Sequence, residues 1–185
     1  MASVLYMSMS LDGFIAGPNE GPGNGLGDGG ERLHEWVFSD ELEVNRVVYE
    51  EFMATGAVVA GRGTFEPAGG WGGDHHDGVP IFIYSRREPG LDISSWPLVT
   101  YVPDVETAMA EAKRAAGDKN VMVHGAAVAQ LALAAGVLDE LEIHVIPFLL
   151  GQGRRLFGEQ NLELERTRVL EGEGGVTHIR YRVIK

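Results

Sequence analysis

The chain has 185 residues, of which 44% are hydrophobic, and its 27 Asp and Glu outnumber its 15 Lys and Arg, giving a net charge of −12. This acidity argues against nucleic acid as a partner, since binding to phosphates depends on Lys and Arg, and the absence of cysteine excludes disulfides and thiolate metal sites. No apolar run approaches the ~20 residues that cross a bilayer, so we expect one cytoplasmic globular domain over residues 1–185, with a small molecule rather than nucleic acid or a membrane as its partner.

The N-terminal segment predicts a strand followed by a long loop. Residues 3–11, SVLYMSMSL, favour a strand that ends at the turn pair Asp12-Gly13, and the start lacks the basic region of a signal peptide. Seven of the fourteen residues in 17–30 are glycine, which disfavours the interior of a helix or a strand. Because long loops inside compact domains are usually functional or disordered, we predict that residues 17–30 form a mobile loop overhanging a site.

Residues 39–55 predict a helix. Ser39 is its candidate N-cap, and Asp40 and Glu41 lie near the positive end of the helix dipole. The apolar stripe of this helix consists of Leu42, Val44, Val47, Val48 and Phe52.

The rest of the chain alternates strands and helices. Strands are expected at 57–61, 79–85, 97–102, 120–125 and 138–150, helices at 104–116 and 126–136, and an antiparallel hairpin over 163–185. Strands that alternate with helices imply parallel βαβ units, and the β-rich tail adds antiparallel strands. The predicted fold class is therefore α/β, with a mixed, mostly parallel sheet flanked by helices and a C-terminal antiparallel hairpin.

Polar or small residues follow three of the predicted strands. The three clusters are Gly61-Arg62-Gly63-Thr64, Ser85-Arg86-Arg87 and His124-Gly125-Ala126-Ala127. Ligands of open α/β sheets collect beyond the carboxyl ends of the strands, and small residues at a strand-to-helix turn admit a phosphate to the backbone amides. Each cluster alone is compatible with a plain turn or close packing, but three clusters at one end of the sheet of an acidic protein indicate a phosphate-bearing ligand. A G-x-G-x-x-G fingerprint after the first strand and a P-loop lysine are both absent.

Other residues have competing interpretations. His75-His76-Asp77 invites a metal site, but adjacent histidines on a loop do not share a face, so no metal is predicted. Trp36 and His34 follow the glycine-rich loop, which favours a substrate pocket over core burial. Asp12 favours a turn over a catalytic acid, because Asp-Gly is a strong turn pair.

Five segments together carry a family resemblance. They are MSLDGFIAG (9–17), AGRGTFE (60–66), IFIYSR (81–86), VHGAAVAQLALAAGVLDEL (123–141) and IPFLLGQGRRLF (146–157). In this order they resemble the dihydrofolate reductase superfamily, and more closely its branch like the reductase domain of the riboflavin-biosynthesis deaminase–reductase. A chain without cysteine lacks the zinc signature of the deaminase, so the resemblance concerns the reductase half.

The resemblance implies an NADPH site. Gly61, Arg62 and Thr64 would meet the phosphates, and Ser85 with Arg86 would bind the adenosine 2′-phosphate. The turn His124-Gly125-Ala126-Ala127 would line the pyrophosphate. Ser8, Ile15 and Ala16 would lie beside the nicotinamide.

The implied activity is that of an NADPH-dependent reductase, which transfers a hydride to a C=N or C=O bond of a small heterocyclic or polar substrate. The likeness is to 5-amino-6-(5-phosphoribosylamino)uracil reductase or dihydrofolate reductase. Dihydrofolate reductases bind the pterin through a carboxylate on the first helix, where this chain has apolar residues such as Val47 and Val48, and this disfavours folate. The alternative is a protein that binds NADP(H) or another small molecule without turnover.

A homodimer is expected, chiefly because relatives with segments like PFLLGQGRRLF pair. Independently, Phe148, Leu149 and Leu150 form an apolar run that one small sheet need not bury fully, and exposed apolar patches tend to mark interfaces. Burial of these residues in the core is the alternative.

His144 is the candidate for handling the proton. Alternation along LEIHVIP puts Glu142, His144 and Ile146 on one face of their strand, and in the resembling folds this part of the strand faces the pocket behind the nicotinamide. With an ordinary pKa near 6.5, a histidine here would hydrogen-bond the substrate or donate the proton that accompanies the hydride. A histidine tied to a backbone carbonyl is the alternative.

Overall fold

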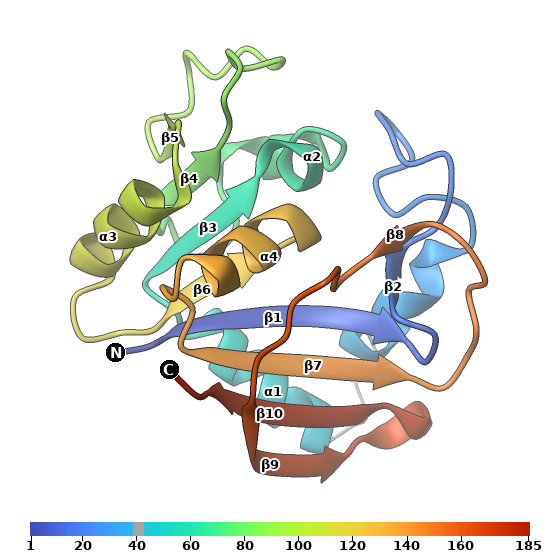
Figure 1. Ribbon diagram of the computed structural model, residues 1–185. Helices are drawn as coiled ribbons and strands as arrows, with labels where there is room; N and C mark the ends of the chain where they lie inside the picture. The colour runs from blue at the N-terminus through green and yellow to red at the C-terminus, as the bar shows by residue number, and fades with distance from the viewer. Residues whose placement is uncertain (39–42) are drawn as a thin grey trace.

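The computed structural model describes residues 1–38 and 43–185, and an eight-stranded sheet runs through its centre (Figure 1). The strand order is β5-β4-β3-β6-β1-β7-β10-β9. The strand bounds are β1 Ser3–Ser10, β3 Ala57–Gly61, β4 Ile81–Tyr84, β5 Val99–Val102, β6 Val121–His124, β7 Glu140–Ile146, β9 Leu164–Glu171 and β10 Thr177–Val183. A second, two-stranded sheet pairs β2 (Phe14–Ala16) with β8 (Arg154–Arg155).

The helices connect these strands. The α-helices are α1 Glu43–Met53, α2 Arg62–Phe65, α3 Val105–Ala116 and α4 Ala126–Ala134, and the 3₁₀ helices are η1 Gly30–Phe38, η2 Gly69–Gly73 and η3 Glu173–Gly175. Helix α3 begins where predicted, because the Asp104 side chain accepts a hydrogen bond from the Thr107 amide as its N-cap. Helix η1, which follows the glycine-rich loop directly, was not predicted from the sequence.

The sheet is parallel from β5 to β7 and antiparallel at its other edge, where β10 pairs with both β7 and β9. The predicted α/β class, with a mostly parallel sheet and a C-terminal antiparallel hairpin, is confirmed. Strand β7 is shorter than the predicted strand at 138–150, since Pro147 has no amide hydrogen to continue the ladder.

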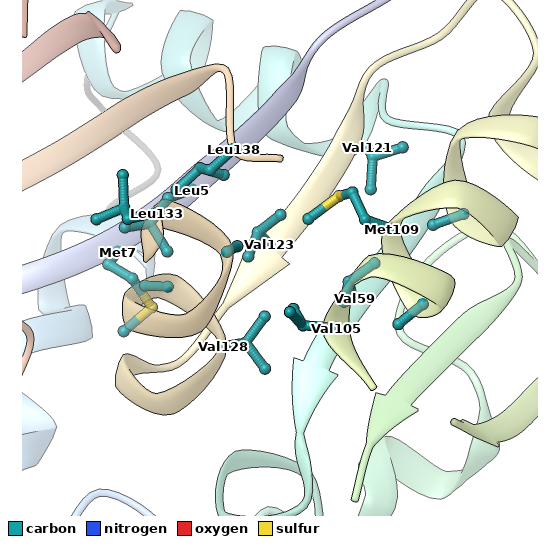
Figure 2. Close-up of a cluster of buried hydrophobic side chains, with 14 of the residues drawn as sticks. Leu5, Met7, Val59, Val105, Met109, Val121, Val123, Val128, Leu133 and Leu138 are labelled. Atoms are coloured by element: carbon teal, nitrogen blue, oxygen red, sulfur yellow. The ribbon is translucent and has the colours of Figure 1, made fainter. Parts of the chain in front are cut away.

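Helices α3 and α4 cover one face of the sheet. Figure 2 shows this part of the core, where Val105 and Met109 of α3 and Val128 and Leu133 of α4 pack on strand residues such as Val123. A second apolar cluster, which includes Val58, Ile81 and Phe65, lies on the opposite face. Burial on both faces explains the near-continuous apolar runs of the central strands.

Helix α1 corrects part of the predicted stripe. Val48 is fully buried, but Val47 is 42% exposed, and the buried polar residue Asn45 takes a place on the inner face. Residues 45, 48 and 52 are three and four positions apart, which is the spacing of one helix face. The predicted cap at Ser39, the acidic residues Asp40 and Glu41, and Leu42 lie outside the described residues.

Candidate functional site

A cavity of about 760 Å³ opens at the carboxyl ends of the central parallel strands. Its walls come from β1, β2, the glycine-rich loop, η1, α1, α2, the segment at 67–75, the end of β6 and strand β7. Pockets for small molecules have volumes of about 300–1,000 Å³. The cavity is therefore large enough for a small molecule, and it lies at the edge of the sheet that the sequence singled out.

The cavity brings together about half of the predicted site residues. Lining it are Ser8, Ile15, Ala16, Thr64 and His124 from the predicted cofactor set, His34 and Trp36 from the predicted substrate pocket, and the candidate His144. The remaining cofactor candidates lie beyond its lining, at Gly61, Arg62, Ser85, Arg86, Gly125, Ala126 and Ala127.

The ends of β3 and β6 meet closely at Gly125 and Thr64. Gly125 has φ +90° and ψ 150°, which only glycine adopts readily, and a Cβ there would overlap Oγ1 of Thr64. The Gly125 amide also lies 3.3 Å from Sδ of Met7. Glycine at this position therefore lets the first turn of α4 approach Thr64, which faces the cavity.

We expect Gly125→Ala to lower the free energy of unfolding by about 2–3 kcal/mol, because it adds both backbone strain and overlap with Thr64. Gly136→Ala is the matched control: Gly136 also has a positive φ, +68°, but open space around it, so its cost should be only about 1 kcal/mol. Urea unfolding of both variants measures the difference. Equal losses would contradict the close approach at Thr64.

The two regions predicted to bind phosphates, one at Arg62 and the other at Ser85 and Arg86, make different contacts. Nη1 of Arg62 lies 3.0 Å from Oε2 of Glu66, one turn along the chain. The Ser85 hydroxyl closes a turn by donating to the Arg87 carbonyl at 2.7 Å. Arg86 is exposed just past β4, and no ion pair joins it to another described residue. Because Tyr84 is paired with Gly61, the ends of β4 and β3 lie at one edge of the sheet, as predicted.

At the end of the cavity near Trp36, three polar side chains form a row across three neighbouring strands. Ser8, His144 and His178 are in register on β1, β7 and β10. Nε1 of Trp36 donates to Oγ of Ser8 at 2.8 Å. The centroid of the indole ring lies 4.5 Å from that of the His144 ring and 4.9 Å from that of the His178 ring. The indole of Trp36 on η1 therefore packs against all three side chains of this row.

His144 is tied to a second histidine rather than to a backbone carbonyl. Its Nδ1 lies 2.8 Å from Nδ1 of His178, and Nε2 of His178 lies 3.0 Å from Oδ1 of Asn45. His144 is 3% exposed, and burial together with the neighbouring histidine lowers its pKa well below 6.5. The ordinary pKa assumed from the sequence is therefore wrong, and His144 is uncharged at neutral pH.

The opposite end of the cavity holds more histidines. Nδ1 of His75 lies 2.8 Å from Nδ1 of His76, and Nδ1 of His124 lies 3.0 Å from the Tyr6 carbonyl. The His75 and His124 rings are 5.2 Å apart. Burial lowers the pKa of His75 to about 4 and that of His124 well below 6.5. In the chain outside residues 39–42, no three His, Asp or Glu side chains are grouped so as to hold a metal ion.

The sequence matches the family described as RibD C-terminal domain over residues 3–177. The chain belongs to this family. The resemblance stated from the five segments is thereby confirmed. No curated protein matches the sequence.

Solved structures show the same fold for this RibD C-terminal domain. The putative riboflavin biosynthesis protein of Shewanella sp. PV-4 is 23% identical, with a TM-score of 0.73 over 100% of both chains. RibD of Acinetobacter baumannii is 18% identical, with a TM-score of 0.67 over 100% of this chain and 59% of its own. Dihydrofolate reductase of Enterococcus faecalis, solved with NADP(H) and RAB-propyl, is 16% identical, with a TM-score of 0.65 over 100% and 97% of the two chains. The fold is dihydrofolate-reductase-like.

The glycine-rich loop of this RibD C-terminal domain forms part of the cavity wall. Glu20, Gly23, Gly25 and Leu26 line the cavity, and hydrogen bonds such as Gly17 N–H to Leu26 O (2.8 Å) hold the loop together. The loop therefore reaches the cavity, and its predicted mobility stays a prediction.

An ion pair that was not predicted from the sequence joins this loop to β8. Nε of Arg154 on β8 lies 2.7 Å from Oε2 of Glu20, and both residues line the cavity. Arg154 belongs to the segment GQGRRLF, which carried the resemblance, but nothing in that segment indicated a partner in the loop.

In the part of the chain that the structure describes, no helix is long and apolar enough to cross a membrane.

Proposed function

We propose that the protein is an NADPH-dependent reductase that transfers a hydride to a C=N or C=O bond of a small heterocyclic or polar substrate. The observation that carries this proposal is the cavity at the carboxyl ends of β1, β3 and β6, where Ser8, Ile15, Ala16, Thr64 and His124 meet. Membership of the RibD C-terminal domain family supports a reductase-like activity. The dihydrofolate reductase relative, solved with NADP(H), supports a nicotinamide cofactor.

The residues at this edge of the sheet fit a dinucleotide. Gly125 lets the turn that opens the nine-residue helix α4 approach Thr64, and the amides at a helix N-terminus suit a phosphate. In our proposal Gly61, Arg62, Thr64 and the turn at 124–127 hold the phosphates. Ser85 and Arg86 bind the 2′-phosphate, and Ser8, Ile15 and Ala16 flank the nicotinamide. When bound, NADPH supplies the hydride.

The substrate then takes the part of the cavity between Trp36 and Trp71. His144 and His34 line this part, together with Trp36, and His144 is our candidate for contact with the reacting group. At neutral pH the uncharged ring of His144 serves as a hydrogen-bond partner for the substrate.

The rival is an NADP(H)-binding protein without turnover, and one observation favours it. Among the described residues, the single carboxylate that lines the cavity belongs to Glu20, and Arg154 already pairs with it. NADPH oxidation measured against pteridines, aminopyrimidine ribitol precursors and simple imines separates the two. Turnover on any of them supports the reductase, while tight NADPH binding with no turnover on all of them supports the rival.

Arg86→Ala should weaken NADPH binding by about tenfold to a hundredfold, because a charge-assisted hydrogen bond to the 2′-phosphate contributes about 1.5–3 kcal/mol. NADH, which lacks this phosphate, should bind the variant as it binds the native protein. Titration of both cofactors by fluorescence measures the two affinities, and Arg87→Ala, next in the chain, is the matched control. Equal losses for NADPH and NADH would show that Arg86 does not read the phosphate.

We also propose that the protein is a homodimer. Phe148 and Leu150 are half-buried, but Leu149 is 70% exposed, and the neighbouring Leu11, whose amide donates to the Phe148 carbonyl, is 66% exposed. Light scattering at micromolar concentration should give twice the chain mass of 20.0 kDa. Leu149→Lys should shift the mass toward that of one chain, and a native protein that scatters as a monomer refutes the dimer.

A further inference from the structure

The tautomer of His144 follows from its partners. The Asn45 amide nitrogen lies 3.5 Å from the Glu173 carbonyl, which orients the Oδ1 of Asn45 toward Nε2 of His178. Since Oδ1 only accepts, Nε2 of His178 carries the proton, and the Nδ1 of this neutral ring is bare. His144 must then donate its Nδ1 proton to His178 at 2.8 Å, which leaves Nε2 of His144 unprotonated.

The same reasoning applies to His75. The Thr55 hydroxyl donates to the Phe52 carbonyl, so the two oxygens of Thr55 are acceptors for Nε2 of His76, at 3.2 and 3.3 Å. His76 therefore accepts at Nδ1 from the Nδ1 proton of His75. Nε2 of His75 is bare, and no described residue makes a hydrogen bond to it.

His124 completes the set. Its Nδ1 faces the Tyr6 carbonyl at 3.0 Å, and because a carbonyl only accepts, Nδ1 carries the proton. Three rings that line the cavity, those of His75, His124 and His144, thus keep their Nδ1 protons for partners within the protein. Each is left with a lone pair on Nε2, for which the described residues provide no donor.

We propose that the cavity recognises its ligand by the ligand's hydrogen-bond donors, which the Nε2 atoms of His75, His124 and His144 accept. The ligand class is a ring with N–H or O–H groups on two opposite edges. One edge faces His144 beside Trp36, and the other faces His75 and His124 beside Trp71. This inference rests on the proposed function only in naming the ligand a substrate.

Two of the partners act as positioning residues. His178 holds His144 in the required tautomer, and His76 does the same for His75. His178 is fully buried, and a side chain at Gly172 would overlap both Oδ1 of Asn45 and Nε2 of His178. The room left by Gly172 is therefore needed for the chain of hydrogen bonds that ends at His144.

Nitrogen NMR of the protein labelled at histidine tests the tautomers without any ligand, because protonated and bare ring nitrogens resonate far apart. The expected spectrum at pH 7.5 has bare Nε2 atoms for all three rings. His178→Phe should convert His144 alone to a mixture of tautomers, and the matched variant His76→Phe should affect His75 alone. A protonated Nε2 on His144 in the native protein overturns the proposal, and this result needs no variant to fold.

Binding of two triazines of similar shape tests the selection of donors. Melamine carries three amino donors, whereas trimethoxytriazine carries acceptors in their place. Melamine should bind at least tenfold more tightly, as two or more hydrogen bonds of about 1 kcal/mol each predict, and should shift the three Nε2 signals. Equal affinities, or no effect of melamine on any of the three rings, overturn the proposal. Neither result depends on reductase turnover, so loss of the proposed activity would be a separate finding.

Discussion

Replacing Arg168 by methionine should lower the free energy of unfolding by about 3–5 kcal/mol, because it removes the nearer of the two arginines that pair with the carboxylates of Glu51 and the buried Glu142. Arg168 on β9 contacts both oxygens of Glu51 at 2.7 Å and Oε1 of Glu142 at 3.2 Å. The Glu142 side chain is fully buried, and its other cation, Arg180, is 3.5 Å away. Burial raises the pKa of Glu142, so its charge depends on these arginines.

Two control variants separate this effect from a general loss at the sheet edge. Arg182→Met breaks an exposed pair with Glu165 between β10 and β9, at the same edge of the sheet, and should cost at most about 1 kcal/mol. Glu142→Gln removes the buried charge together with the cost of burying it, so its effect should also be small. Urea unfolding at pH 7.5 measures all three variants. If Arg168→Met lowers the free energy of unfolding no more than Arg182→Met does, Arg168 does not stabilise the buried carboxylate of Glu142.

The protein should also lose several kcal/mol of stability between pH 6.5 and pH 4. His75 and His178 have pKa values of about 4 in the fold, because burial disfavours their charged forms, against about 6.5 in the unfolded chain. Over this range the unfolded chain binds more protons than the native one, so stability falls as the pH falls. By pH 4, the protonation of each of these two histidines in the unfolded chain has lowered the free energy of unfolding by about 3 kcal/mol.

Other titrating groups also change the stability in or near this pH range. His124 and His144, with their lowered pKa values, add to the loss, and Glu142, with its raised pKa, offsets part of it. Asp12 acts only at lower pH, because hydrogen bonds from Ser10, Leu150 and Gly151 lower its pKa to about 2. Chemical unfolding at half-unit steps of pH measures the slope. His75→Phe should reduce it, and a flat profile from pH 6.5 to 4 would contradict the neutral histidine cluster.

The parts of the fold and site that the sequence predicted are those set by local pattern. The clusters at Gly61 and Gly125 could be read because a strand followed by small residues and a helix is a contiguous signal. Trp36 could be assigned to the pocket because it follows the glycine-rich loop, although the helix that carries it was not predicted.

The partners of these residues could not be predicted, because they depend on contacts distant in the chain. His178 reaches His144 only through the register of β10 on β7, and a shift of one residue would turn it to the other face. Asn45 reaches His178 because α1 turns a polar residue inward, where its amphipathic pattern predicted valines. Burial then lowers the histidine pKa values, which a sequence of residue types cannot show.

The central place of β1 has a consequence for synthesis on the ribosome. β1 is translated long before both of its neighbours in the sheet, which begin at Val121 and Glu140. Until β6 is made, the apolar residues of β1, such as Leu5 and Met7, have no neighbouring strand, and one edge of β1 stays unpaired until β7 follows. Pairing between strands that are distant in the chain slows folding, because a long loop must close, at a cost in entropy, before the strand contacts stabilise it. The apolar edge of β1 is therefore open to aggregation in the nascent chain until β7 has been translated.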